Sequence, residues 1–224
     1  MVKLLFGSII RDGESYLQRY FDQLTTLTSD YKVGLAITEG DSIDNTYAKI
    51  FELCPIEIDL YTFKYNHNGP KFGSVSNPTR WLNIAITWNY MLDNLREVVE
   101  DYDYFIYMES DLIWDKATIS KLITGLQSNR IDAIAPMSML GEIFYDTWGH
   151  RAFDVKFGAL YPYHYKYLDY GRYMPLTSAG SCIAMKPEVI NTCRLSLVDA
   201  MIGHDIVKNN YVFMLDKESK VQHP

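Results

Sequence analysis

A pair of carboxylates follows directly after a short apolar segment, Tyr104–Met108, near the middle of the chain. The five residues of this segment are typical of a buried strand, and Glu109 and Asp111 come at its end. Such a strand carries polar groups to the edge of a parallel sheet, where open α/β sheets bind ligands. A hard divalent cation bound to phosphate needs only one or two protein carboxylates. The triplet Glu109-Ser110-Asp111 therefore predicts a metal–diphosphate site; the alternative is a polar turn that ends a core strand.

Two other expected strands also end in polar side chains. Ser8 and Arg11 follow the first of these strands, and Thr38, Glu39 and Asp41 follow the second. At the same edge of the sheet, an acidic group can accept hydrogen bonds from a base N–H or a ribose hydroxyl. We therefore expect these residues to contact a nucleotide. The alternative for the second segment is capping of the helix that follows it.

Strands and helices alternate through the first part of the chain, up to Pro136. The expected strands are 2–8, 33–37, 56–62, 104–108 and 133–136, and the expected helices are 14–27, 45–53, one that starts after Asn77, and 117–127. Asn77 caps its helix with Pro78 at the first position, and Arg80 follows on a polar face from which it could reach a diphosphate. This order predicts an α/β fold with a mostly parallel sheet flanked by helices.

The texture changes after Pro136, where residues 139–176 are rich in aromatic residues and glycine and show weak periodicity. A short strand is expected at 181–185, a helix at 201–209 and a last strand at 212–215. We see no repeat and no linker, so the sequence predicts a single domain.

The composition excludes several classes of protein. The chain has 224 residues, of which 48% are hydrophobic, and a net charge of −7 without a long basic run, so we expect no nucleic-acid partner. Its cysteines, Cys54, Cys182 and Cys193, are odd in number and lack CxxC spacing, which argues against a disulfide framework and favours a reducing, cytoplasmic compartment. No apolar run approaches the roughly 20 residues of a membrane span, so a soluble protein is expected.

The order of the motifs resembles glycosyltransferases of the Rossmann-like GT-A fold, over nearly the whole chain. In sequence order the motifs are SIIRD, TEGDSIDNT, NPTRWLNIAITWN, YMESD, FYDTWGHR, SAGSCIAM, GHD and QHP. Within that fold the chain looks most like the cryptococcal capsule-type α-1,3-mannosyltransferases, whose Tyr-Asp-x-Trp segment FYDTWGHR resembles. Glu109 departs from the family, which usually has Asp at the first position of the triplet. Family members are commonly membrane-anchored, so this chain is expected to be a soluble form or one module of a longer protein.

The resemblance implies roles for individual residues. Asp111, Glu109 and His223 would bind Mn2+ or Mg2+, and Asp205 would be the catalytic carboxylate that faces the acceptor. Substrate contacts are implied for three residues of the aromatic segment: Asp146, Trp148 and Arg151. The alternatives are a helix cap for Asp205 and a structured loop for these three, and His150 and His204 are assigned no role. If Asp205 is only a cap, the base would be Asp146, Asp154, Glu142 or the leaving diphosphate.

The resemblance implies a metal-dependent glycosyltransferase. It would move a sugar from a GDP- or UDP-linked donor to a hydroxyl of an oligosaccharide or glycoprotein glycan. Residues 1–136 would form the nucleotide-sugar-binding half and 137–224 the acceptor-binding half. Inversion and retention both stay open. One alternative is a nucleotidyltransferase, although its glycine-rich basic loop is reduced here to SIIRDGES. The other is a non-catalytic carbohydrate-binding module, against which the joint presence of Glu109, Asp111 and His223 argues.

Overall fold

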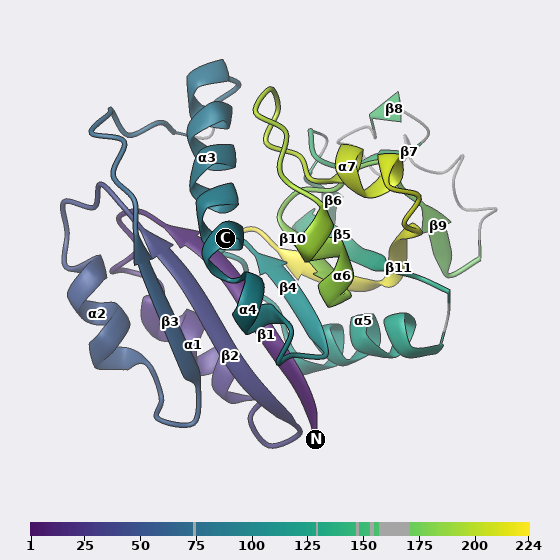
Figure 1. Cartoon of the computed structure of the whole chain (residues 1–224), viewed down its shortest axis with the longest axis horizontal. Helices are drawn as coiled ribbons and strands as arrows, with labels where there is room; N and C mark the ends of the chain where they lie inside the picture. Colours follow the sequence, from purple (N-terminus) through teal and green to yellow (C-terminus); the bar gives the residue numbers. More distant parts are fainter. Residues whose placement is uncertain (74, 129, 147, 153–154, 157–170) are drawn as a thin grey trace.

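A nine-stranded sheet lies between two groups of helices (Figure 1). The structure, a computed structural model, describes residues 1–73, 75–128, 130–146, 148–152, 155–156 and 171–224. The strands are β1 (Val2–Ile10), β2 (Tyr31–Glu39), β3 (Asp59–Lys64), β4 (Tyr104–Met108), β5 (Ala133–Leu140), β6 (Ile143–Phe144), β7 (Arg151–Ala152), β8 (Val155–Lys156), β9 (Tyr173–Pro175), β10 (Cys182–Met185) and β11 (Phe213–Gln222). The helices are α1 (Leu17–Thr25), α2 (Thr46–Leu53), α3 (Pro78–Asn94), α4 (Arg96–Val99), α5 (Lys116–Ser128), α6 (Pro187–Thr192) and α7 (Gly203–Lys208).

The sheet is mostly parallel, as the sequence predicts. Its strand order is β3-β2-β1-β4-β10-β5-β11-β9, with β6 paired to β5. Strands β3, β2, β1 and β4 are parallel neighbours, and β5 is parallel to β11, whereas β10 runs antiparallel between β4 and β5. The carboxyl ends of β1, β2 and β4 therefore lie at one edge of the sheet. Because one sheet includes strands from both ends of the chain, the predicted single α/β domain is confirmed.

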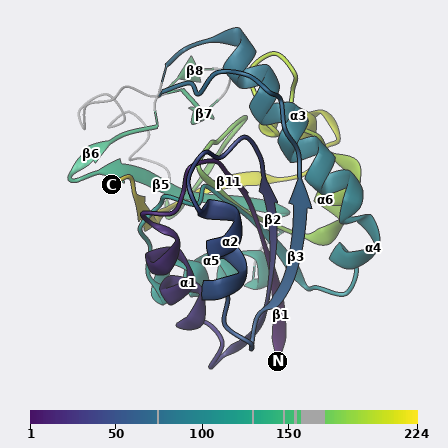
Figure 2. The same ribbon diagram turned by 90° about the vertical axis from the view of Figure 1, so that its left-hand side faces the viewer.

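Successive residues of the buried strands face opposite helical layers. Leu4 and Phe6 of β1 pack in the core that contains α1, α2 and α5, whereas Leu5 packs in the core under α3, α4 and α6. Figure 2 shows these two layers on either side of the sheet. Burial on both faces is why the strands of a parallel sheet are continuous apolar runs.

Small residues make room on the α3 side of the sheet. A Cβ at Gly7 would lie 2.4 Å from the ring of Phe105, and one at Gly34 would lie 2.2 Å from the hydroxyl of Tyr102. Large side chains there would force the aromatic rings outward. The two glycines therefore let the rings fill the space between the sheet and α3, a helix that contributes to both cavities described below.

The start of α3 is capped as predicted. The Asn77 side chain accepts hydrogen bonds from the N–H groups of Thr79 and Arg80, at 2.9 and 3.1 Å, and Pro78 is the first helical residue. The boundary predicted for the third strand is wrong, since β3 begins at Asp59. The cause is the turn before it, in which Ile56 is 97% exposed although it fits an alternating pattern.

Strand β11 continues well beyond the predicted 212–215, because its polar middle is paired. Asp216 is fully buried, and Arg172 donates to both of its oxygens at 2.8 and 2.7 Å, while the Ser219 hydroxyl donates at 2.6 Å. The register of β11 on β5 shifts between Asp216 and Lys220, and the strand then continues to Gln222. A polar run that looks like the end of a strand is therefore accommodated by a bulge and a buried ion pair.

Two expectations about the chain as a whole can be compared with the structure. All three cysteines are free thiols, in agreement with the predicted lack of a disulfide framework. Within the described residues, every helix is too short or too polar to cross a bilayer.

We predict that Arg172→Met lowers the free energy of unfolding by about 2–3 kcal/mol, because it leaves a buried carboxylate unpaired. Burial opposes ionisation of Asp216, but the hydrogen bonds from Arg172 and Ser219 outweigh it and lower its pKa. The stabilisation is therefore complete above the unfolded pKa of about 3.9 and is lost as the pH falls through the lower folded pKa. Urea unfolding at pH 7 and in acid measures both effects. Arg96→Met, which removes an exposed ion pair with Asp93, is the control and should cost less than about 1 kcal/mol.

Candidate functional site

Strand β4 delivers the acidic triplet to the carboxyl edge of the sheet. The N–H of Glu109 donates to the carbonyl oxygen of Ser181 at 2.8 Å, and the guanidinium of Arg19 donates to the carbonyl oxygen of Asp111 at 2.6 Å. Between them, the hydroxyl of Ser110 lies 3.2 Å from that of Tyr16. These contacts fix the main chain of the triplet and leave the two carboxylates to face a cavity.

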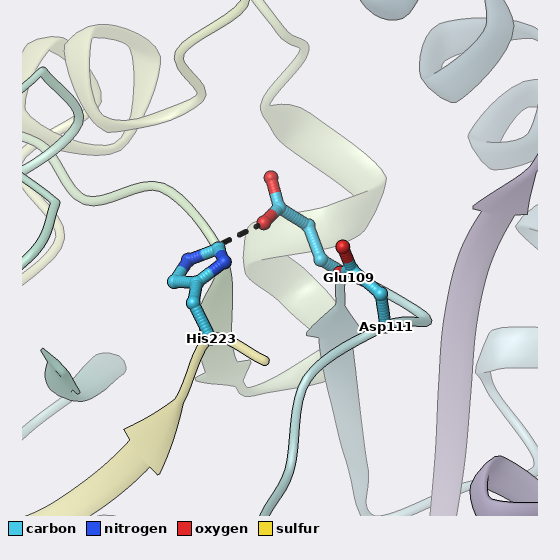
Figure 3. A group of neighbouring side chains, drawn as sticks. All are labelled: Glu109, Asp111 and His223. Atoms are coloured by element: carbon cyan, nitrogen blue, oxygen red, sulfur yellow. Dashed lines mark ion pairs between the residues drawn. The ribbon is translucent and has the colours of Figure 1, made fainter. Parts of the chain in front are cut away.

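The last residues of β11 bring an imidazole to the same place. The N–H of His223 donates to the carbonyl oxygen of Met139 at 2.8 Å, which extends the pairing of β11 with β5. One ligand atom each from Glu109, Asp111 and His223 lie within 4.8 Å of one another. Figure 3 shows the His223 ring and the Glu109 carboxylate pointing toward each other, and Nε2 and Oε2 are 3.9 Å apart. The three residues predicted as metal ligands are therefore brought together.

The electrostatics of this group favour a bound cation. Burial raises the pKa of Glu109 to about 8, and the negative charges of Asp111 and Asp146 add to the effect. Burial also lowers the pKa of His223, which keeps its imidazole available as a neutral ligand. A divalent cation would relieve the repulsion between the carboxylates. Two carboxylates and one imidazole make a donor set that suits Mn2+ or Mg2+ with phosphate oxygens as further ligands.

A cavity of about 350 Å3 opens at the ends of β1, β2 and β4, and we call it the β1–β2 cavity. Six of the predicted ligand contacts line it: Arg11, Thr38, Asp41, Arg80, Glu109 and Ser110. Asp111 lines it too. The hydroxyl of Thr38 is buried and has no hydrogen-bond partner among the described residues. A buried hydroxyl without a partner at a cavity wall indicates a place for a polar ligand group.

Asp41 and Arg11 hold the far wall of the β1–β2 cavity. The carboxylate of Asp41 accepts the N–H groups of His67 and Asn68 at 2.8 and 3.0 Å. Arg11 donates to the carbonyl oxygens of Gly69 and Pro70 at 3.2 and 3.1 Å. The ends of β1 and β2 are thereby tied to the segment 66–70, which follows β3.

Two of the predicted nucleotide contacts, Ser8 and Glu39, do not line the β1–β2 cavity. Ser8 is fully buried, where its hydroxyl bonds to Tyr20 at 2.6 Å and to the carbonyl oxygen of Met108 at 2.7 Å. Glu39 is 2% exposed, lies 3.7 Å from the ammonium of Lys64 and accepts the N–H of Ser42. Ser8 stands two positions before the end of β1 and Glu39 is the last residue of β2, and each side chain is held by these partners instead.

A second cavity of about 350 Å3 lies on the other side of the triplet, and we call it the Trp81–Trp148 cavity. The two indole rings stack with centroids 4.7 Å apart and an angle of 15° between their planes. Asp146, Asp199 and His223 also line this cavity. Arg80, Ile84, Tyr107 and Glu109 line both cavities, so the two spaces meet at one shared wall.

The predicted substrate residue Asp146 lines this cavity, and the buried His150 lies behind it. The carboxylate accepts the N–H of Gly149 at 2.6 Å, and Nδ1 of His150 lies 3.1 Å from its other oxygen. His150 is fully buried. His150, to which the sequence assigned no role, therefore contacts one of the predicted substrate residues.

The predicted catalytic residue Asp205 lies outside both cavities. It is in the first turn of α7, where its carboxylate accepts the N–H of Arg194 at 3.1 Å. Asp199, and not Asp205, lines the Trp81–Trp148 cavity. Its Oδ2 lies 3.0 Å from Nη1 of Arg151 and 3.0 Å from Nε2 of His204. Asp199 is not predicted from the sequence because no helix or strand pattern surrounds it. Arg151 acts here as a partner of Asp199, and His204 joins this pair. The alternative base Asp154 lies outside the described residues.

Solved glycosyltransferase structures resemble this chain in fold. No protein-family model and no curated protein sequence matches it. A mannosyltransferase from Pyrobaculum calidifontis, in complex with GDP-Man and Mn2+, aligns with a TM-score of 0.62 at 12% identity, over 98% of this chain and 56% of the other. TarS from S. aureus, in complex with UDP-GlcNAc, aligns with a TM-score of 0.60 at 10% identity, over 99% and 58%. Glucosyl-3-phosphoglycerate synthase from Mycobacterium tuberculosis, with Mg2+ and UDP, aligns with a TM-score of 0.57 at 12% identity, over 100% and 72%.

These likenesses confirm the predicted GT-A fold. This chain spans less than three fifths of the length of the first two proteins. The narrower resemblance to the capsule-type mannosyltransferases stays a prediction, as do the roles of single residues.

We predict that Asp111→Ala weakens Mn2+ binding by more than about tenfold, because loss of a direct carboxylate ligand should cost at least as much as the roughly 10–100-fold lost with an outer partner of a ligand. His223→Ala should weaken it less, since water can replace a neutral imidazole. Electron paramagnetic resonance of free Mn2+, titrated with folded protein, measures both affinities. Asp205→Asn, outside the cavities, is the control. Equal Mn2+ affinity of Asp111→Ala and the unchanged protein would contradict the assignment.

Proposed function

We propose that the chain is a metal-dependent glycosyltransferase that moves a sugar from a nucleoside-diphosphate sugar to a hydroxyl of a glycan. One observation carries the proposal: the two cavities share a wall that includes Glu109, the first residue of the acidic triplet. A group transfer between two substrates needs two neighbouring sites with the reacting atoms at their boundary. The GT-A fold and the nucleotide-bound state of the similar structures support the same reading.

The β1–β2 cavity would hold the nucleoside of a GDP- or UDP-linked donor. The Thr38 hydroxyl can exchange a hydrogen bond with a base edge, and Asp41 can accept one from a ribose hydroxyl. Asp111 and Ser110 line the same cavity and would lie next to the diphosphate. The position agrees with the general rule that α/β sheets bind ligands outside the carboxyl ends of their strands.

Glu109, Asp111 and His223 would hold Mn2+ or Mg2+ next to the diphosphate. When bound, such a cation stabilises the negative charge that develops on the leaving nucleoside diphosphate. Arg80 lines both cavities and is a second cation at the boundary. A guanidinium matches phosphate oxygens in geometry. Arg80 would therefore bind the diphosphate and, together with the metal ion, stabilise its negative charge as it leaves.

The Trp81–Trp148 cavity would hold sugar. Sugars expose apolar C–H faces that pack on indole rings, while their hydroxyls donate to carboxylates such as Asp146 and Asp199. Burial would raise the pKa of Asp199, but hydrogen bonds from Ser196, Arg151 and His204 outweigh it and lower the pKa, so the carboxylate stays ionised. An ionised carboxylate at the wall can take a proton.

The transfer itself forms one bond and breaks another. The acceptor oxygen bonds to the anomeric carbon, the bond from that carbon to the diphosphate oxygen breaks, and its electron pair leaves with the diphosphate. For inversion the acceptor proton passes to a carboxylate, for which Asp199 is the candidate. For retention the leaving diphosphate takes the proton instead. The catalytic role predicted for Asp205 would require a carboxylate that leaves its contact with Arg194.

We predict that GDP or UDP stabilises the protein against heat only when Mn2+ is present. At a ligand concentration 100 times Kd, binding adds about 2.7 kcal/mol to the free energy of unfolding. A thermal-shift panel of nucleoside diphosphates and nucleotide sugars, with and without Mn2+, measures this and identifies the base. Thr38→Val keeps the shape of the side chain and should reduce the shift. If no nucleoside diphosphate changes the Tm, the proposed function is wrong.

Asp199→Asn should lower sugar transfer by about 10²-fold or more, because general-base catalysis contributes about 10²–10⁴-fold. Asp205→Asn is the matched control, and we expect it to transfer sugar at near the unchanged rate. Single-turnover transfer from the donor that the thermal panel selects measures both rates. The reverse order of the two rates would return the catalytic role to Asp205.

A further inference from the structure

Asp146 is held from behind by a cradle that fits a carboxylate. Gly149 donates its N–H to Oδ1 at 2.6 Å, and Nδ1 of His150 lies 3.1 Å from Oδ2. A Cβ at Gly149 or at Gly180 would lie 2.5 Å from Oδ2, so both positions leave room only for a hydrogen. The Asp146 side chain is still 10% exposed, at the wall of the Trp81–Trp148 cavity.

The hydrogen bonds of His150 determine where its protons lie. Its Nε2 is 3.1 Å from the carbonyl oxygen of Pro136, and a carbonyl oxygen only accepts, so Nε2 carries a hydrogen. Its Nδ1 faces the carboxylate of Asp146, which accepts as well when it is ionised. One further proton must therefore lie between Nδ1 and Oδ2. The N–H of Gly149 favours the ionised carboxylate, so Nδ1 of His150 is the donor in this contact.

The surroundings show what the contact with His150 does for Asp146. Asp146 acts electrostatically on Glu109 and on His223, two of the proposed metal ligands. The Asp146 carboxylate adds to the repulsion within the acidic triplet, and its contact with His150 lies on the side away from that triplet's cavity wall. Burial opposes ionisation of Asp146, but the hydrogen bond and charge of His150 outweigh it, so its pKa is lowered. The side chain of His150 is 1% exposed and cannot touch a substrate itself.

We propose that Asp146 binds a hydroxyl of the transferred sugar and that His150 is its positioning residue. The inference rests on the proposed function. Each oxygen of Asp146 keeps a second lone pair beyond its bond to the protein, and the exposed part of the side chain lies at the cavity wall. Tyr145, the residue before Asp146, packs against His223 with ring centroids 4.1 Å apart and an angle of 44° between the ring planes. Asp146 therefore lies on the metal side of the cavity, where the sugar that is attached to the diphosphate would be.

The test compares a nucleotide sugar with its own nucleoside diphosphate, so that the contribution of the sugar is isolated. Calorimetry with Mn2+ gives the affinities for GDP-mannose and GDP, and for UDP-glucose and UDP. Asp146→Asn and His150→Gln should each weaken nucleotide-sugar binding by about 10- to 100-fold, because a hydrogen bond to a charged group is lost. Binding of the free nucleoside diphosphate should stay within about twofold. The double variant should lose little more than either single one, since both act through one contact.

Asp132→Asn is the matched control, since Asp132 also combines a cation, Lys186 at 2.8 Å, with a main-chain N–H, that of Val212 at 2.9 Å. It lies just before β5, away from both cavities, and should leave the affinity ratio unchanged. Folded His150→Gln with an unchanged ratio would overturn the inference. If the unchanged protein binds neither GDP nor UDP in the presence of Mn2+, the proposed function itself is overturned.

A second measurement does not depend on any ligand. Nitrogen-15 spectra of the histidine rings at pH 7.5 should show hydrogen on both nitrogens of His150. In Asp146→Asn, Nδ1 should lose its hydrogen while Nε2 keeps its own, because the bond to Pro136 remains. An unprotonated Nδ1 in the unchanged protein would overturn the positioning role.

Discussion

Repulsion between the carboxylates of Glu109 and Asp111 is the constraint on which the site depends. Strand β4 ends at these two groups, and although 41% of the Glu109 side chain is exposed, its partial burial and the charges of Asp111 and Asp146 raise its pKa to about 8. His223 approaches the pair only because β11 continues past its polar middle. That continuation buries Asp216, which would be costly without Arg172. An ion pair deep in the sheet and the proposed metal ligands are therefore parts of one arrangement.

Helix α3 joins the two cavities. Asn77 and Pro78 fix its first turn, which places Arg80 and Trp81 directly above the carboxyl edge of the sheet. The small residues Gly7 and Gly34 on the sheet below leave space for the rings of Phe105 and Tyr102, on which this face of the core is built. Local capping and core packing together set the position of the wall that the two cavities share.

The second part of the chain builds its side of the site from charged pairs. Asp146 is held by His150 and Gly149, and Asp199 is held by Arg151 and His204. Both carboxylates stay ionised because their partners offset the cost of burial. Contacts of this kind order loops that have little regular secondary structure. They also hold the two carboxylates, which accept hydrogen bonds, in fixed positions at a cavity wall.

The sequence by itself determined the α/β class, most strand and helix positions, the Asn77 cap and the grouping of Glu109, Asp111 and His223. The first three of these features follow from local periodicity, from capping chemistry and from the rule that strand ends share an edge. The grouping of His223 with the two carboxylates came instead from the resemblance to GT-A glycosyltransferases. Only the tertiary structure decided that Ser8 and Glu39 turn away from the cavities, and that Asp199 rather than Asp205 faces one of them. The same holds for His150, which contacts Asp146 on one side and Pro136 on the other. The direction of a side chain in a loop depends on partners far along the chain, such as Arg151 for Asp199, and no local pattern encodes those partners.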